Sequence, residues 1–358
     1  MRKPKDRDFI RTTEDLLFCV VGCLHPHDRL LSYLKYIPSD SGIWASGDLH
    51  FKRMIPYYSA KSVIDTHSFL KEEYPKYLFY SRVNDITFPA VPRSEIKEYY
   101  EPEVRLKELV GRKGELDELQ RKAVELAEYL SSRSGVPLDR FGVTGSILLG
   151  IHNVSISDVD LTIYGHENAL LVKQALIREF ENTENPSRLR QLNESEAEDW
   201  CTRKTRQFSI DYGFAAAILR KKWNFGFYEE KFFSIHPIKL DSEITEIYGE
   251  KEFTSKGTVE IIADVADSTE ALFNPASYKV NEVRILEGLK VNDIEEVVSF
   301  EGFFSDLASN NESIRVKGNL ETVTGVRSGK KYHRVVVGSK NVSSPEYIIP
   351  ISQLKEEI

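Results

Sequence analysis

The sequence predicts an α+β protein with an N-terminal α/β region, a central mixed sheet with helices, and a C-terminal small β-barrel-like domain. Apolar residues recur at helical spacing from Leu116 to Ser132, and strand-like runs follow this helix. From Tyr248 onwards, short alternating runs are separated by Gly, Asn and Ser turns, which predicts strands. A chain of 358 residues is also longer than one typical hydrophobic core needs. We therefore expect three domains, over residues 1–100, 101–247 and 248–358.

The composition is that of a folded protein. Hydrophobic residues make up 41% of the chain, with 19 Phe and 17 Tyr, which excludes a disordered chain. The net charge of −8 argues against a strongly basic nucleic-acid binder, although a local basic groove is compatible with it. Three cysteines indicate a reducing compartment. The apolar run Leu16–Leu24 is too short to span a bilayer, and no signal-peptide pattern precedes it, so we expect a cytoplasmic protein without a membrane partner.

The N-terminal region carries no catalytic motif. Its pattern predicts helices over Ser59–Glu72 and Ser94–Tyr100, the second capped by Ser94. We expect this region either to recognise an acceptor substrate or to brace the central domain.

The central region predicts a helix, a strand, a turn and a second strand. Gly135-Val136-Pro137 ends the helix, and Arg140–Thr144 reads as the first strand. The second strand contains Asp158 and Asp160, which alternate with the apolar Val159, Leu161 and Ile163. Side chains two residues apart share one face of a strand, so the two carboxylates point the same way and repel each other. A divalent metal relieves that repulsion, and Mg²⁺ prefers such oxygen ligands together with substrate phosphates.

The turn between these strands begins with Gly145 and Ser146, before a helical turn through Leu149. A glycine lets a phosphate approach the backbone, and N–H groups and a hydroxyl at a helix start bind that anion. A phosphate cradle beside a metal pair suits nucleotidyl or phosphoryl transfer. An ordinary hairpin with two solvated aspartates is the plainer alternative.

The order Gly145-Ser146, spacer, Asp158-Val159-Asp160-Leu161 resembles the signature of the DNA polymerase β-like nucleotidyltransferase superfamily. The resemblance covers about residues 110–245 and implies Mg²⁺ (two ions, with Mn²⁺ as a substitute) and a nucleoside triphosphate donor. More broadly, the chain is similar to uncharacterised, mainly archaeal proteins predicted to be nucleotidyltransferases. Under this resemblance Asp158 and Asp160 hold the metals, while Gly145 and Ser146 bind the β- and γ-phosphates.

The superfamily usually adds a third carboxylate from a later strand. Asp211, in the run Phe208–Phe214, is our preferred candidate for this catalytic metal ligand, because its neighbours alternate as in a strand. It could instead be the N-cap of a helix that follows. The alternative acid is Asp241, at the end of the strand Lys231–Leu240, which offers His236 where an acid is wanted.

Basic residues follow the acidic pair. Arg203, Lys204 and Arg206 are candidates for binding the triphosphate, since cations neutralise its charge during transfer. A solvated helix face is the alternative for each of them. Trp200 could stack on a base, but burial in a core is the more ordinary role.

The C-terminal strands contain two glycines, Gly302 and Gly318, which we interpret as bulges that bend a small barrel, with an oligonucleotide-binding barrel as one candidate. Basic residues gather between Arg315 and Arg334, beside Tyr332. This cluster is compatible with RNA, or with ordinary outward-facing strand residues.

These features together predict a Mg²⁺-dependent nucleotidyltransferase that moves a nucleoside monophosphate from a nucleoside triphosphate to an acceptor hydroxyl, for which RNA is our hypothesis. One metal would activate that hydroxyl and the other would stabilise the departing pyrophosphate. The alternative is a nucleotide-sensing or RNA-binding protein that keeps the fold without turnover, and a third reading is a scaffold in which the motif is coincidental.

Overall fold

A computed structural model of the chain describes residues 2–55, 59–182, 188–339 and 345–351. The fold is α+β, as the sequence predicts. The chain divides into two compact units. The first comprises Met1–Pro56, Pro89–Leu192 and Trp223–Thr245; the second comprises Tyr57–Phe88, Asn193–Lys222 and Glu246–Ile358. These units do not follow the three sequence segments, because contacts between distant stretches of chain, and not chain order, decide which segments pack into one core.

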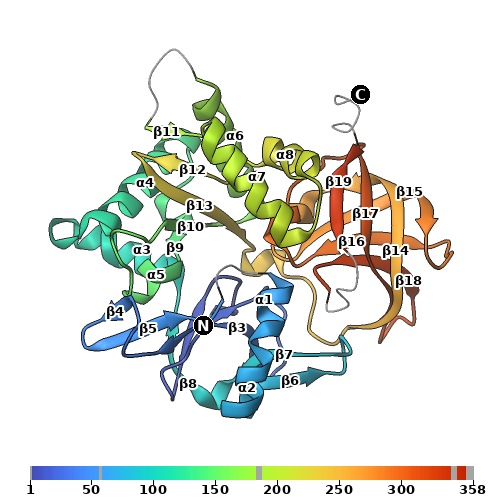
Figure 1. The fold of residues 1–358 in the computed structure, drawn as a ribbon, viewed down its shortest axis with the longest axis horizontal. Coiled ribbons are helices and arrows are strands. Elements are labelled where there is room, and N and C mark those ends of the chain that lie inside the picture. Colours follow the sequence, from blue (N-terminus) through green and yellow to red (C-terminus); the bar gives the residue numbers. More distant parts are fainter. Residues whose placement is uncertain (1, 56–58, 183–187, 340–344, 352–358) are drawn as a thin grey trace. The chain divides into compact units, whose positions relative to one another are not determined.

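The first unit contains an N-terminal sheet in the order β4-β5-β3-β2-β1-β8 (Figure 1). Its strands are β1 (Phe9–Thr12), β2 (Leu17–Val20), β3 (Arg29–Pro38), β4 (Trp44–Ser46), β5 (Leu49–Arg53) and β8 (Ile96–Tyr100). The predicted helix over Ser94–Tyr100 is wrong, since Ile96–Tyr100 pairs with β1 as an edge strand. Tyr99 and Tyr100 favour a strand because aromatic side chains suit a pleated surface.

The first unit also holds the sheet that carries the acidic pair, in the order β11-β12-β13-β10-β9. These strands are β9 (Phe141–Val143), β10 (Val159–Tyr164), β11 (Leu189–Arg190), β12 (Phe225–Tyr228) and β13 (Lys231–Ile238). β10 lies in the interior of the sheet, antiparallel to β9 and parallel to β13. The predicted strands Arg140–Thr144 and Lys231–Leu240 are therefore confirmed.

Helices α3 (Pro102–Gly111), α4 (Glu118–Ser134), α5 (Gly145–Leu149) and α6 (His166–Glu181) belong to the same unit, and α4 and α6 pack on β10. The helix predicted over Leu116–Ser132 is α4. Asp117 caps it, with Gln120 in a reciprocal capping box, and Gly135 ends it in the left-handed region at φ +74.

The second unit contains α1 (Ala60–Asp65), α2 (His67–Glu73), β6 (Leu78–Ser81) and the start of β7 (Ile86–Pro92), whose last residues pair with β3 in the first unit's sheet. The predicted helix over Ser59–Glu72 is confirmed as α1 and α2. Two longer helices, α7 (Glu194–Phe208) and α8 (Tyr212–Lys221), follow later in the chain.

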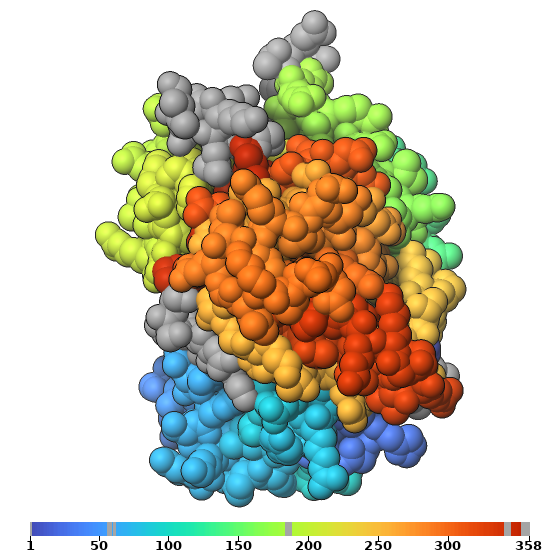
Figure 2. Space-filling view, turned by 90° about the vertical axis from the view of Figure 1, so that its right-hand side faces the viewer, coloured from blue at the N-terminus to red at the C-terminus, as the bar shows by residue number. Residues whose placement is uncertain are grey.

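The C-terminal strands form a barrel-like sheet, as predicted. β14 (Lys251–Asp267), β15 (Ala276–Glu287), β16 (Ile294–Ser299), β18 (Lys331–Val337) and β17 (Ser313–Gly325) pair in that order, and β17 returns to pair with β14, while β19 (Tyr347–Pro350) pairs with β17. These strands, in orange and red, form one continuous surface in Figure 2.

The bulges that we expected at two glycines are wrong. Gly302 lies in a 3-10 turn, Gly302–Phe304, outside the strands. Gly318 keeps its register with Val259. A Cβ at Gly318 would lie 2.4 Å from the carbonyl oxygen of Val336, so this glycine allows two strands to approach closely. The register between β14 and β17 shifts instead near Gly257, whose φ is +95.

Among the described residues, no helix is long and apolar enough to cross a membrane.

Candidate functional site

The acidic pair lies at the start of β10. Asp158 directly precedes the strand, and Asp160 is its second residue. The turn before α5 is tied to this point, because the Thr144 N–H donates to the Asp160 carbonyl oxygen at 2.9 Å. The structure therefore brings the Gly145-Ser146 turn and the two aspartates together within one unit.

Gly145 is required by its surroundings. Its φ is +68, and a Cβ there would lie 2.6 Å from Oδ2 of Asp160. Only glycine adopts such a conformation without cost and leaves room for the carboxylate. Ser146 is the second residue of the short helix α5 and is 8% exposed, so it is largely buried.

The Asp160 carboxylate has polar neighbours on β13. The parallel register places Ser234 opposite Asp160. The Ser234 hydroxyl donates to Oδ1 of Asp160 at 2.5 Å, and Nε2 of His236 lies 2.9 Å from that hydroxyl and 3.8 Å from Oδ1. Burial opposes ionisation of Asp160, but His236, Lys35 and Ser234 together hold its pKa well below the usual range. Asp160 is therefore a stable anion.

Asp158 behaves differently. Desolvation by the surrounding protein and the charge of Asp160 raise its pKa to about 6, while the charges of Lys231 and Arg53 lower it in part. Its side chain remains exposed at the surface. A carboxylate held beside a second anion is stabilised by an added cation, so the pair attracts positive charge from solvent.

Three cations of the N-terminal segment and sheet act on this pair. Arg7 and Lys35 both interact electrostatically with Asp160, and Arg53 interacts in the same way with Asp158. Sequence reasoning missed all three, because they precede the motif by about a hundred residues or more. The one indication was Lys35 itself, a lysine in the strand RLLSYLKYIP, which is otherwise largely buried.

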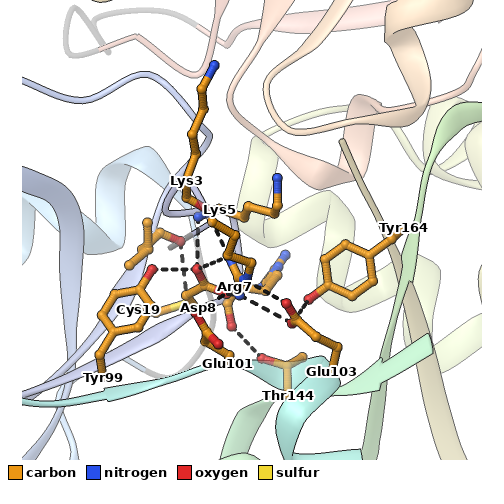
Figure 3. A network of polar contacts seen from close by, with 12 residues as sticks. Lys3, Lys5, Arg7, Asp8, Cys19, Tyr99, Glu101, Glu103, Thr144 and Tyr164 are labelled. Carbon is orange, nitrogen blue, oxygen red and sulfur yellow. Dashed lines mark hydrogen bonds and ion pairs between the residues drawn. The ribbon is translucent and has the colours of Figure 1, made fainter. Parts of the chain in front are cut away.

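A polar network anchors the segment that contains Arg7 (Figure 3). Asp8, which is fully buried, accepts hydrogen bonds from the guanidinium of Arg2 at 2.6 and 2.9 Å and from the hydroxyl of Tyr99. Arg2 also forms an ion pair with Glu103, which accepts a hydrogen bond from Tyr164 at the end of β10.

The same segment reaches the motif directly. The Thr144 hydroxyl donates to the Arg7 carbonyl oxygen at 2.7 Å, one residue before Gly145 (Figure 3). The N-terminal segment is therefore tied to the residue before Gly145 and, through Glu103, to the end of β10. These contacts hold Arg7 near Asp160. The expected bracing role of the N-terminal region has a physical basis in these contacts.

The donor set fits a divalent cation in part. Asp158 and Asp160 supply two hard oxygen ligands of the kind that Mg²⁺ takes, with substrate phosphates and water as the usual remaining ligands. No group of three or more His, Cys, Asp or Glu side chains is arranged to hold a metal among the described residues. On β13, the neighbouring strand, the polar side chains beside Asp160 are Ser234 and His236 and not the third carboxylate that we expected.

The preferred third ligand, Asp211, lies in the second unit and not in a strand. The strand that we expected over Phe208–Phe214 is wrong, because α7 ends at Phe208 and Asp211 is the N-cap residue of α8. The helix-cap alternative is confirmed in its position, without a side-chain capping bond. Asp241 follows β13 in the first unit, where its carboxylate pairs with Lys5, away from the strand position of Asp160.

The three basic candidates lie on α7, also in the second unit. Arg203 and Arg206 are exposed. Lys204 lies among the rings of Trp200, Phe208 and Phe303 at 5.6–5.8 Å, and burial lowers its pKa to about 8. Trp200 is 7% exposed, which confirms burial as its role. Lys204 therefore contributes to an aromatic core of that unit.

Most of the C-terminal basic cluster is paired with acids. Arg315 pairs with Glu260, Lys317 with Glu287, Lys330 with Glu295, His333 with Asp293 and Arg334 with Glu321. Tyr332 is 7% exposed, so its ring is not available for stacking on a base. Arg327 and Lys331 are exposed, and neither forms an ion pair with any described residue.

The ligand role of Asp211 remains a prediction, which single substitutions test. Asp211→Asn removes the charge and keeps the size of the side chain, so a metal ligand at this position would be lost and Mg²⁺-dependent transfer abolished. Asp241→Asn should be mild, because that carboxylate pairs with Lys5. Steady-state transfer rates of both variants decide the question, and full activity in both would remove both residues from the mechanism.

The chain is similar to the uncharacterized protein MJ1086 of Methanocaldococcus jannaschii. The two are 31% identical over 348 residues, which cover 97% of this chain and 98% of the relative. No protein-family model and no solved structure matches the chain.

Proposed function

Since this chain belongs to one family with the uncharacterized protein MJ1086 of Methanocaldococcus jannaschii, we propose for it a function derived from its own site: Mg²⁺-dependent nucleotidyl transfer from a nucleoside triphosphate to an acceptor hydroxyl. The observation that carries the proposal is the contact between the Gly145 turn and the Asp160 carboxylate, with Asp158 beside it. The polymerase β-like architecture that the sequence resembles is part of this proposal.

The transfer forms a bond between the acceptor oxygen and the α-phosphorus and breaks the bond from that phosphorus to the bridging oxygen. Pyrophosphate leaves, and the hydroxyl proton is lost to solvent. Asp158 and Asp160 would hold a divalent cation, which would supply positive charge to the phosphates. Ser234 and His236 hold the Asp160 carboxylate ionised and in place, while Gly145 leaves space for it.

The direct test is pyrophosphate release. The purified protein with Mg²⁺, each nucleoside triphosphate in turn, and a mixture of cellular RNA as acceptor should release pyrophosphate and attach labelled nucleoside monophosphate. No incorporation with any acceptor class, in a protein that binds the nucleotide, would favour the alternative of a nucleotide-sensing or RNA-binding protein. A protein without any nucleotide affinity would favour a scaffold.

RNA is our proposed acceptor, and the exposed Arg327 and Lys331 are the cations left to attract it. Their double replacement by Ala should weaken binding of single-stranded RNA and lower the slope of log affinity against log salt by about 1.4, because each lost phosphate contact removes about 0.7. Binding titrations at several salt concentrations measure this slope. The paired Lys330→Ala is the control, and an unchanged slope in the double variant would move the acceptor to another class.

A further inference from the structure

Lys35 occupies an irregular position in the N-terminal sheet. In the pairing of β2 with β3, Leu17 lies opposite Tyr36 and Phe18 opposite Leu34, so Lys35 is the extra residue of a β-bulge. Bulges redirect a side chain away from the ordinary alternation and are frequent beside active sites. The bulge takes Lys35 out of the regular alternation of this largely buried strand, and the charges of Lys35 and Asp160 act on each other.

The Lys35 ammonium is buried and has no carboxylate in direct contact among the described residues. The side chain is 8% exposed, and its nitrogen lies 5.2 and 5.7 Å from the ring centres of Phe9 and Tyr36. Burial lowers its pKa to about 8, and the charge of Asp160 opposes this effect. A buried ammonium without a hydrogen-bonded anion costs stability, and a ligand phosphate would supply that contact.

An open pocket of about 580 Å³ lies on the β4–β5 hairpin and is lined by Trp44, Lys52 and Arg53, among others. Its volume is within the roughly 300–1,000 Å³ of small-molecule sites. The pocket adjoins Lys35 through Tyr36, whose ring centre lies 5.5 Å from that of Trp44 and 5.9 Å from the Arg53 guanidinium.

The hairpin also reaches the motif. The Ala45 N–H donates to the Ile151 carbonyl oxygen at 3.1 Å, just after α5. Arg53 lies exposed and, among the described residues, has no hydrogen-bond or ion-pair partner, while its charge acts on Asp158. The pocket therefore offers the ring of Trp44 and the guanidinium of Arg53, whose charge acts on Asp158.

We propose that the N-terminal sheet is part of the nucleotide site: Lys35 and Arg53 bind the phosphates of the nucleoside triphosphate, and Trp44 stacks on its base. This proposal rests on the proposed function for the identity of the ligand, but it concerns binding and not turnover. The bulge, the buried ammonium and the pocket are three separate observations that lead to the same ligand chemistry, a planar ring joined to a polyanion.

Equilibrium binding of two probes tests the proposal. The probes are each nucleoside triphosphate and inorganic tripolyphosphate, both with Mg²⁺ and without an acceptor. Lys35→Met should weaken both at least tenfold, because the buried cation is lost while the straight side chain is kept. Trp44→Ala should weaken the nucleotide about tenfold and leave tripolyphosphate unchanged, since only the nucleotide has a base. Trp44→Phe should restore nucleotide binding.

Thermal unfolding separates a ligand role from a structural one. Lys35→Met should change Tm little, because it removes the desolvation cost of a buried charge together with the attraction between that charge and Asp160; a lower Tm with normal binding would overturn the proposal. The matched control is Lys97→Met, which removes the same charge from the exposed pair with Asp15. Equal losses of both probes in Trp44→Ala would remove the base from this pocket.

The outcomes also distinguish this inference from the proposed function. Binding that follows the expected pattern without any nucleotidyl transfer would leave the inference standing and contradict the transfer. Transfer by a protein whose Lys35 and Trp44 variants bind normally would do the reverse. A wild-type protein that binds neither probe would overturn both.

Discussion

Asp158→Asn is expected to lower nucleotidyl transfer by at least about a hundredfold, because it removes one of the two charges that attract the divalent cation. Folding should be unaffected in the absence of metal. Asp158 is exposed, but desolvation by the surrounding protein and the charge of Asp160 raise its pKa to about 6. The ionised carboxylate therefore destabilises the folded protein, and its removal should not lower the free energy of unfolding. Initial rates and Tm, measured without and with Mg²⁺, check both parts.

The matched control is Asp139→Asn, an exposed aspartate in the same unit whose ion-pair partner among the described residues is its neighbour Arg140. It should leave both rate and Tm unchanged. Asp160→Asn is a less clean test, because it also disturbs the hydrogen bond from Ser234 and the balance with Lys35 and His236. Retained transfer in Asp158→Asn, with a normal response to Mg²⁺, would contradict the assignment of the acidic site.

Gly145→Ala is expected to destabilise the protein by about 2–5 kcal/mol and to reduce transfer at least tenfold. The new methyl group meets Oδ2 of Asp160 at 2.6 Å, and the backbone has a φ of +68. The left-handed conformation alone costs an alanine about 1–2 kcal/mol, and overpacking adds about 1–3 kcal/mol. Transfer falls because the carboxylate that holds the metal must move. Denaturant unfolding and initial rates measure the two effects.

Gly135 provides the control for the backbone term. Its φ is +74, and a Cβ there would meet nothing within 4 Å. Gly135→Ala should therefore cost only the conformational part, about 1–2 kcal/mol, and leave transfer unchanged. Equal losses of stability in the two variants would mean that Asp160 shifts without cost, and that Gly145 serves the turn alone.

Local patterns predicted the elements that carry the motif. The spacing of apolar residues predicted α4 and the strands β9, β10 and β13, because the 3.6- and 2-residue periods are visible in the chain itself. The alternation around Asp158 and Asp160 also predicted their common face. Local pattern failed at Ser94–Tyr100 and at Phe208–Phe214, where pairing with β1 and the end of α7 decided the outcome.

The sequence by itself determined the chemical character of the site: two carboxylates two residues apart at the start of a strand, and a glycine turn before them. Only the tertiary structure decided what surrounds them. Parallel pairing of β10 with β13 places Ser234 beside Asp160, and Lys35, whose charge acts on Asp160, lies at a bulge in β3. Periodicity reports which face of an element is buried, whereas neighbours in space depend on strand order and register, which arise from packing between segments far apart in the chain.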